Sequence, residues 1–251
     1  MLMNSTILTN IGRANAAPEP SRNGHSGRYR TYLLFGAPGS GKGTQGKALG
    51  TVPRFFHCAC GDVFRSLDTR TKLGQAFVYY SSRGELVPDS ICLELWKHSI
   101  SGAVETHRFK PELDALLLDG IPRNSGQAEL MESLIDVVKI FHLSCPDRST
   151  LVERLRKRAL KDNRLDDANE AVILKRLETY EIETKPLLDY YPPELIHTID
   201  ATLSPARVLW EILGVITGQG VNASDKARTE VTEFTEAERS RRSNLGISLA
   251  P

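Results

Sequence analysis

A glycine-rich stretch that directly follows a short apolar run limits the folds and the ligands open to this chain. Residues 32–35 read Tyr-Leu-Leu-Phe, and residues 36–44 read Gly-Ala-Pro-Gly-Ser-Gly-Lys-Gly-Thr. A buried strand that runs through a glycine turn into a helix points several backbone N–H groups at one spot, which suits a phosphate chain. Lys42 adds a positive charge for the β- and γ-phosphates. The stretch therefore predicts a site for a nucleoside triphosphate.

The stretch departs from the strict phosphate-loop pattern at one position. That pattern has Ser or Thr immediately after the Lys, whereas here Gly43 intervenes and Thr44 carries the hydroxyl. The alternative interpretation is a glycine turn that binds nothing. The preceding apolar strand and the helical pattern over residues 42–49 supply the context that favours a phosphate loop.

Composition limits the classes of function. The 251 residues include 32 basic and 31 acidic side chains, so we expect no broad nucleic-acid surface. No stretch has the apolar length of a membrane span, so we expect no membrane partner. The four cysteines (Cys58, Cys60, Cys92 and Cys145) lack the spacing of a zinc site. We therefore expect no structural zinc, and reduced thiols in the cytoplasm.

The two ends of the chain differ from its middle. Residues 1–28 are rich in Asn, Ala, Ser, Gly and Pro, and residues 219–251 are polar. We expect a disordered N-terminal extension, a domain over residues 29–218 and a polar C-terminal tail. An organelle transit segment has a bias similar to that of residues 1–28, so that alternative stays open. Nothing outside these tails suggests an interface, and we expect a monomer.

Strand-like apolar runs alternate with helical patterns between the tails. Such an alternation predicts a parallel sheet covered by helices on both faces. With the phosphate loop, it indicates an α/β fold of the P-loop NTPase type with five strands. The predicted strands are 32–35, 55–60, 115–118, 139–143 and 195–199. The predicted helices are 42–49, 61–68, 71–83, 88–101, 125–135, 147–160, 169–191 and 204–217.

Chemistry-bearing residues follow the predicted strands, where ligands of such sheets bind. Asp119 ends an apolar run and is placed to orient Mg²⁺ or its waters. Arg123 follows it, and Gln127 offers the donor and the acceptor that a base edge requires. Arg65 lies in the first turn after another strand. These positions predict a shared cleft at one edge of the sheet.

Two further segments bear on this cleft. Gly84 breaks a helix, and the apolar pair before Pro88, which includes Val87, can line a pocket for a flat base. Arg158, Arg164 and Arg176 flank a short polar segment that can fold over phosphates, because planar guanidinium groups suit phosphate oxygens. The alternative for the arginines is a salt-bridged surface helix.

In combination these motifs resemble the nucleoside monophosphate kinases, and among them the adenylate kinases with a short lid. The resemblance covers residues 30–217. It rests on residues 36–45, on Gly61-Asp62 with Arg65, on Gly84 with residues 86–88, on residues 119–123 with Gln127, and on Arg158, residues 164–167 and residues 176–180.

The resemblance implies reversible phosphoryl transfer from Mg-ATP to AMP, giving two ADP. It also implies a small helical AMP-binding lobe at about residues 61–89 and a short lid at about residues 159–168. The implied ATP-binding residues are Gly39, Ser40, Gly41, Lys42, Gly43, Thr44 and Arg158. The implied AMP-binding residues are Cys60, Arg65, Val87, Gly120, Arg123, Gln127, Arg164 and Arg176. The implied catalytic residues are Lys42, Arg123, Arg158, Arg164 and Arg176, with Asp119 organising Mg²⁺ mainly through water.

One departure keeps the choice of acceptor open. Adenylate kinases usually carry Ser-Thr before the Gly-Asp pair, and this chain has Ala59-Cys60. A thiol is a weak donor and acceptor, so Cys60 leaves a UMP/CMP kinase or a broad-specificity enzyme as the alternative. Gln127 favours AMP, because pyrimidine-specific relatives tend to have Asn there. A nucleotide sensor without turnover is a further alternative, which the full set of cationic residues argues against.

Overall fold

The computed structural model describes residues 27–162 and 169–218. The chain divides into two compact units, residues 1–208 and 209–251. The first unit holds the sheet and the cavity considered below. The described part of the second unit is residues 209–218, which include the C-terminal part of α9 (Pro205–Ile216). The predicted N-terminal extension up to residue 26, the predicted tail and residues 163–168 of the predicted lid lie outside the described residues.

The centre of the first unit is a five-stranded parallel sheet with the order β2-β3-β1-β4-β5. Its strands are β1 (Tyr29–Phe35), β2 (Phe55–Ala59), β3 (Ala115–Asp119), β4 (Ile135–Ser144) and β5 (Ile196–Asp200). Residues 115–118 are all buried, as expected for a strand that is covered on both faces. The predicted fold class is confirmed.

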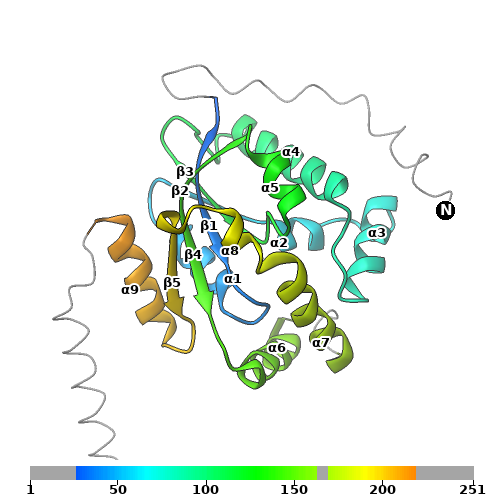
Figure 1. The fold of residues 1–251 in the computed structure, drawn as a ribbon. Coiled ribbons are helices and arrows are strands. Elements are labelled where there is room, and N and C mark those ends of the chain that lie inside the picture. Colours follow the sequence, from blue (N-terminus) through cyan, green and yellow to red (C-terminus); the bar gives the residue numbers. More distant parts are fainter. Residues whose placement is uncertain (1–26, 163–168, 219–251) are drawn as a thin grey trace, which may run out of the picture. The chain divides into compact units, whose positions relative to one another are not determined.

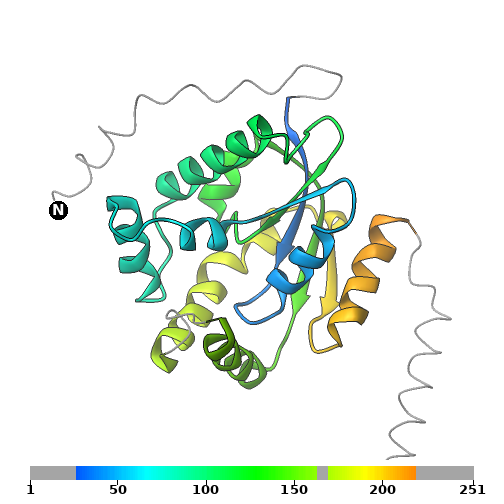
Figure 2. The same cartoon turned by 180° about the vertical axis from the view of Figure 1, so that it is seen from behind.

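Helices cover both faces of this sheet (Figures 1 and 2). The helices between β1 and β4 are α1 (Lys42–Leu49), α2 (Cys60–Arg65), α3 (Lys72–Ser81), α4 (Asp89–Glu105) and α5 (Ser125–Met131). Between β4 and β5 lie α6 (Arg148–Asp162), α7 (Glu170–Thr179), a π-helix (Tyr180–Thr184), α8 (Leu187–Tyr190) and a 3₁₀ turn (Pro193–Leu195).

The two faces are distinguished by the alternation of side chains along each strand. Leu33 and Cys58 pack into the main core together with Trp96 of α4. Next to Cys58, His57 points to the opposite face, where it packs against Gly46 of α1. A Cβ on Gly46 would lie 2.3 Å from His57 Nε2, so this glycine lets α1 approach the sheet closely.

Several predicted boundaries were wrong. Cys60, predicted at the end of a strand, is the first residue of α2. The helix predicted for 125–135 ends at Met131, and β4 begins at Ile135 because Ile135 pairs with Tyr29 of β1. This pairing also extends β1 beyond its predicted start at Tyr32. Propensity within one segment carries no information about such a partner.

The single helix predicted for 169–191 is divided into α7, the π-helix and α8. Lys185 N–H donates to Tyr180 O at 2.9 Å, which is a five-residue return, one residue longer than in an α-helix. Pro186 follows directly and has no N–H to continue the ladder. Tyr180 and Thr184, at the two ends of the π-helix, line the cavity at the end of the sheet.

Strand register brings the loops after β1, β2 and β3 to one edge. Asp119, the last residue of β3, is in register with Leu34 on one side and with Ala59 on the other. The carboxyl ends of these strands therefore meet, as expected for ligand sites in parallel sheets.

Candidate active site

A cavity of about 760 Å³ lies at the carboxyl ends of the strands and extends to α6 and α7. It brings together every candidate site residue that lies within the described part of the chain. These are Gly39, Ser40, Gly41, Lys42, Gly43, Thr44, Cys60, Arg65, Val87, Asp119, Gly120, Arg123, Gln127, Arg158 and Arg176. Arg164 lies outside the described residues.

The glycine-rich loop between β1 and α1 is shaped by close contacts. Gly36 has a φ of 143°, and a Cβ there would lie 2.6 Å from Leu143 O, so a side chain does not fit. Gly41, in the left-handed conformation, caps the N-terminus of α1. Ser40 is buried, and its hydroxyl has no hydrogen-bond partner among the described residues. A buried donor of this kind, beside a helix N-terminus, suits a phosphate oxygen.

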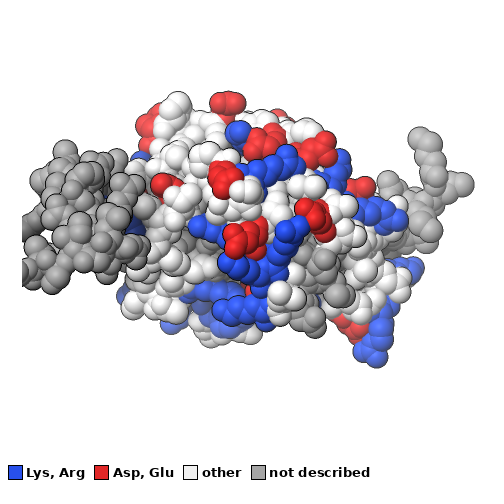
Figure 3. All heavy atoms as spheres, turned by 90° about the horizontal axis from the view of Figure 1, so that it is seen from below, with Lys and Arg blue, Asp and Glu red and all other residues white. Residues whose placement is uncertain are grey.

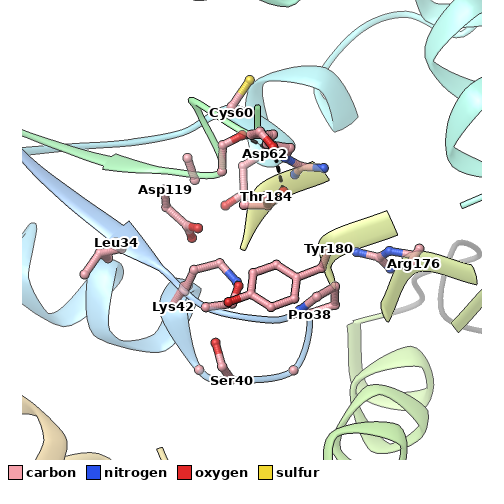
Figure 4. Close-up of a pocket in the computed structure, with 18 of the residues that line it drawn as sticks. Leu34, Pro38, Ser40, Lys42, Cys60, Asp62, Asp119, Arg176, Tyr180 and Thr184 are labelled. Atoms are coloured by element: carbon pink, nitrogen blue, oxygen red, sulfur yellow. Dashed lines mark hydrogen bonds between the residues drawn. The ribbon is translucent and has the colours of Figure 1, made fainter. Parts of the chain in front are cut away.

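Lys42 reaches back over this loop. Its Nζ donates to Gly36 O at 2.6 Å and to Ala37 O at 3.0 Å. Figure 4 shows its side chain between Asp119 and the ring of Tyr180. Burial lowers the pKa of Lys42 to about 8. The charge of Asp119 opposes this shift, and three nearby arginines (Arg123, Arg158 and Arg176) add to it.

Three positive groups therefore act on Lys42 within the cavity. A chain of phosphates supplies several negative charges at once, and these favour the charged form of Lys42. Figure 3 shows Lys and Arg side chains, with Asp and Glu among them, on the face at the lower end of Figure 1, to which the arrowheads of β4 and β5 point. The electrostatics of the cavity thus favour a polyanionic ligand.

Asp119 is the carboxylate best placed for a cation. A Cβ on Gly43 would lie 3.7 Å from Asp119 Oδ2, so the glycine after Lys42 leaves space beside this oxygen. No group of three or more His, Cys, Asp or Glu side chains among the described residues is arranged to hold a metal by itself. The residues present fit a Mg²⁺ ion whose other ligands are phosphate oxygens and water.

Arg65 of α2 and Arg123 of the loop after β3 line the cavity. Arg65 Nη2 donates to Asp62 Oδ1 at 2.5 Å and lies over Gly61, where a Cβ would be 3.0 Å from it. Arg123 Nε donates to Gly120 O at 2.8 Å. Among the described residues, each guanidinium makes one hydrogen bond to its own segment, and its remaining N–H groups can bind a phosphate.

Gln127 lies behind the Arg123 loop and is 1% exposed. Its Oε1 accepts from Arg123 N–H at 2.8 Å, and its Nε2 donates to Asp89 Oδ1 at 2.7 Å. Asn124 Nδ2 donates to the same carboxylate at 3.1 Å, and Asn124 Oδ1 caps α5 by accepting from Gln127 N–H. The amide that was expected to contact a base is therefore also anchored within the protein.

Two thiols, those of Cys60 and Cys92, line the cavity. Burial raises the pKa of Cys60 to about 11 and that of Cys92 to about 12, so both are neutral thiols. Cys92 Sγ contacts Val87 O at 3.4 Å. All four cysteines lie within the described residues and are free.

Sequence reasoning missed several residues that shape the site. Tyr180 and Thr184 line the cavity, and Thr184 Oγ1 donates to Arg123 O at 2.7 Å. Asp89 anchors Gln127 across 38 residues of sequence. The helix-capping preference of Asn points to Asn124 from sequence alone. No sequence signal pairs Asp89 with Gln127 or Thr184 with Arg123.

No described helix is long and apolar enough to cross a membrane.

Comparison with known proteins gives the same family for most of the chain. Residues 34–195 match the sequence profile of the family described as "Adenylate kinase". The adenylate kinase of Porphyromonas gingivalis is 37% identical over 191 residues, which cover 73% of this chain and 94% of that protein. The adenylate kinase of a Cyanothece species is 36% identical, covering 73% and 93%. The adenylate kinase of Bifidobacterium longum is 40% identical over 164 residues, covering 63% and 84%. The chain therefore belongs to the adenylate kinase family.

Proposed function

We propose that this protein catalyses the reversible transfer of the γ-phosphoryl group of ATP to AMP, which gives two ADP. The observation that carries the proposal is the cavity itself. Lys42, Arg123, Arg158 and Arg176 meet there beside a phosphate loop. A charge cluster of this density suits two phosphate chains that approach each other end to end.

The donor nucleotide binds at the phosphate loop in this proposal. Backbone N–H groups of residues 39–44, the Ser40 hydroxyl and the Lys42 ammonium would hold its phosphates. Arg158 would contact the same chain from α6, whose cavity-lining residues lie at its C-terminal end. Asp119 would hold Mg²⁺ mainly through water, and the bound ion supplies charge compensation to the phosphates.

The acceptor binds on the lobe side. Arg65 and Arg123 would hold the phosphate of AMP, with Cys60, Val87, Gly120 and Gln127 around the base. Arg176, and Arg164 from the predicted lid, would neutralise the group in transfer. Positioning and charge stabilisation supply the catalysis, so the chemistry requires no covalent intermediate.

Water competes with AMP as an acceptor, so the site has to close when both nucleotides are bound. We propose that the lobe at about 61–89 and the lid at about 159–168 make this closure. The contact of Gly84 with α7, the helix that follows the predicted lid in the sequence, supports the proposal. Thr179 Oγ1 donates to Gly84 O at 3.1 Å, and a Cβ on Gly84 would lie 3.0 Å from Val172 O.

The setting of the enzyme is part of the proposal. The four free cysteines support a reducing compartment, and we propose that the protein is a monomer in the cytoplasm. The nearly balanced charge supports the proposal that it binds no nucleic acid or membrane. Size-exclusion chromatography with light scattering would test the oligomeric state of the full chain.

The acceptor is tested by a coupled assay that compares AMP, UMP and CMP at equal concentration with Mg-ATP. We expect AMP to be phosphorylated fastest, because an amide such as Gln127 suits the edge of adenine. Faster turnover of UMP or CMP would favour the pyrimidine kinase that Cys60 leaves open. No turnover of any acceptor, with ATP bound, would favour the sensor.

A further inference from the structure

The side-chain amide of Gln127 is held between two partners that allow only one orientation. Arg123 N–H is a backbone group and can only donate, so the atom 2.8 Å from it has to be Oε1. The carboxylate of Asp89 can only accept when ionised, so the atom 2.7 Å from it has to be Nε2. If the amide turned over, a donor would face a donor and an acceptor would face an acceptor.

Asp89 is placed to act through Gln127 rather than on a ligand. Gln127 lines the cavity, whereas Asp89 and Asn124 line a separate depression. Asn124 also contacts this carboxylate, since its Nδ2 lies 3.1 Å and 3.3 Å from the two oxygens of Asp89. The first turn of α4 is thus connected to the first turn of α5 by a network of three side chains.

After these contacts Gln127 retains one N–H and one lone pair for a ligand in the cavity. Because Asp89 fixes which of the two atoms is the donor, it also fixes which base edge the amide matches. A 6-aminopurine presents an acceptor at N1 beside an amino donor, and a 6-oxopurine presents the reverse pair. The amino and oxo pyrimidines differ in the same sense, with N3 in place of N1.

We propose that Asp89 is a positioning residue that makes the acceptor site select amino over oxo nucleobases by locking the orientation of the Gln127 amide. This inference rests on the proposed function in taking Gln127 as a base contact. The selection comes from the two bonds that a turned amide would lose, of which the bond to the charged carboxylate is the stronger.

The test is the ratio of kcat/KM for AMP to kcat/KM for IMP, with Mg-ATP as donor. Asp89→Leu removes the acceptor, so the amide can turn at the cost of the Arg123 contact alone. We expect the ratio to fall about tenfold or more, as the KM for AMP rises and the KM for IMP falls. Asp89→Asn keeps an acceptor but can also present its NH₂, so the ratio should fall less, by about threefold.

Asn124→Ser is the matched control. Serine is also a good helix cap, so α5 keeps its cap while the bond from residue 124 to Asp89 is lost. The Asp89 contact to Gln127 remains, and the AMP-to-IMP ratio should stay at the wild-type value. If Asp89→Leu does not fold, Asp89→Asn measured against Asn124→Ser decides the question.

A loss of activity that is equal for AMP and IMP in the Asp89 variants would overturn the inference and leave Asp89 a structural role only. Failure of the proposed function looks different. If the wild-type protein used CMP or UMP instead of AMP, the same variants would be compared on CMP against UMP. If it showed no turnover, the four monophosphates would be titrated calorimetrically. If the preference for CMP over UMP, or for AMP over IMP in binding, were smaller in the Asp89 variants than in the wild type, the inference would be supported without the proposed reaction. An unchanged preference would overturn it.

Discussion

The phosphate-loop region (residues 36–44) and the α4–α5 region (residues 84–89 and 119–127) both contribute residues to the cavity but are built differently. Lys42 is held by carbonyl oxygens five and six residues away along the chain. In the α4–α5 region, Gln127 is held by Asp89 at 38 residues' separation and Arg123 by Thr184 at 61. The first region is organised by its own backbone, the second by side chains from distant elements.

This difference between local and long-range contacts explains why one region can be predicted from the sequence and the other cannot. A loop whose geometry depends on glycines and on one lysine can be recognised in a short segment. A side-chain network has no such local signature, because its members are brought together only when the helices pack. Changes in the phosphate-loop region should therefore act on the chemistry, and changes in the α4–α5 region on the choice and affinity of the acceptor.

The largest effect is expected from Arg158→Ala. If Arg158 contacts the phosphoryl group in transfer, kcat should fall about 10³–10⁵-fold, or about 4–7 kcal/mol in the barrier. Arg156→Ala on the same helix is the control, because Arg156 pairs with Glu170 on the surface and does not line the cavity. Steady-state kinetics on both variants checks this, and equal kcat values for the two would remove Arg158 from the catalytic set.

A smaller effect, on the free energy of unfolding, is expected where Gly84 contacts α7. Gly84 has a φ of +70°, and a Cβ there would meet Val172 O at 3.0 Å, so Gly84→Ala should lower the free energy of unfolding by about 1–3 kcal/mol. Gly102→Ala in α4 meets nothing within 4 Å and should raise it by about 0.5–1 kcal/mol. Urea unfolding gives both values, and a neutral Gly84→Ala would mean that the junction is looser than its contacts indicate.

The charge of Lys42 predicts a pH dependence of nucleotide binding. Its pKa of about 8 lies below the usual 10.5, so without nucleotide it loses its proton as the pH rises through 8. Phosphates favour the charged form, so ATP binding above that pH should take up a proton, and affinity should fall by up to about tenfold per pH unit. Calorimetry in two buffers of different ionisation enthalpy measures the uptake.

The same shift bears on stability. Between pH 8 and 10.5 the unfolded chain binds more protons at this residue than the folded chain, so this group adds stability as the pH rises through that window. Lys42→Arg is the control, since arginine stays charged and should show neither the proton uptake nor this stability term. Uptake that persisted in Lys42→Arg would assign the titration to another group.

The smallest effect is expected from Thr184→Val, which removes the hydroxyl that donates to Arg123 O. One neutral hydrogen bond is worth about 1 kcal/mol, so the KM for AMP should rise several-fold while kcat changes little. Thr106→Val, where the hydroxyl donates to Gly102 O at the end of α4, is the control with no contact to the cavity. A larger change in kcat than in KM would place Thr184 with the catalytic residues instead.

Local patterns in the sequence were enough to predict the parallel sheet and the phosphate loop. Both follow from local patterns: the apolar run at 115–118 is buried on both faces, and Gly36 and Gly41 adopt backbone conformations that favour glycine. The sequence also selected the cationic residues, because Lys42, Arg123 and Arg176 follow recognisable elements. Their meeting in one cavity was expected from the common edge at which parallel strands end.

Strand lengths, the division of one predicted helix and the orientation of the Gln127 amide were decided only by the tertiary structure. The pairing of Tyr29 with Ile135 lengthened two strands, and the five-residue return at Lys185 divided a predicted helix. The orientation of the Gln127 amide depends on Asp89, which reaches it only after α4 has packed beside α5. Hydrogen bonds between distant side chains leave no periodicity in the sequence, so a pattern predicts which residues face the cavity but not how each is held there.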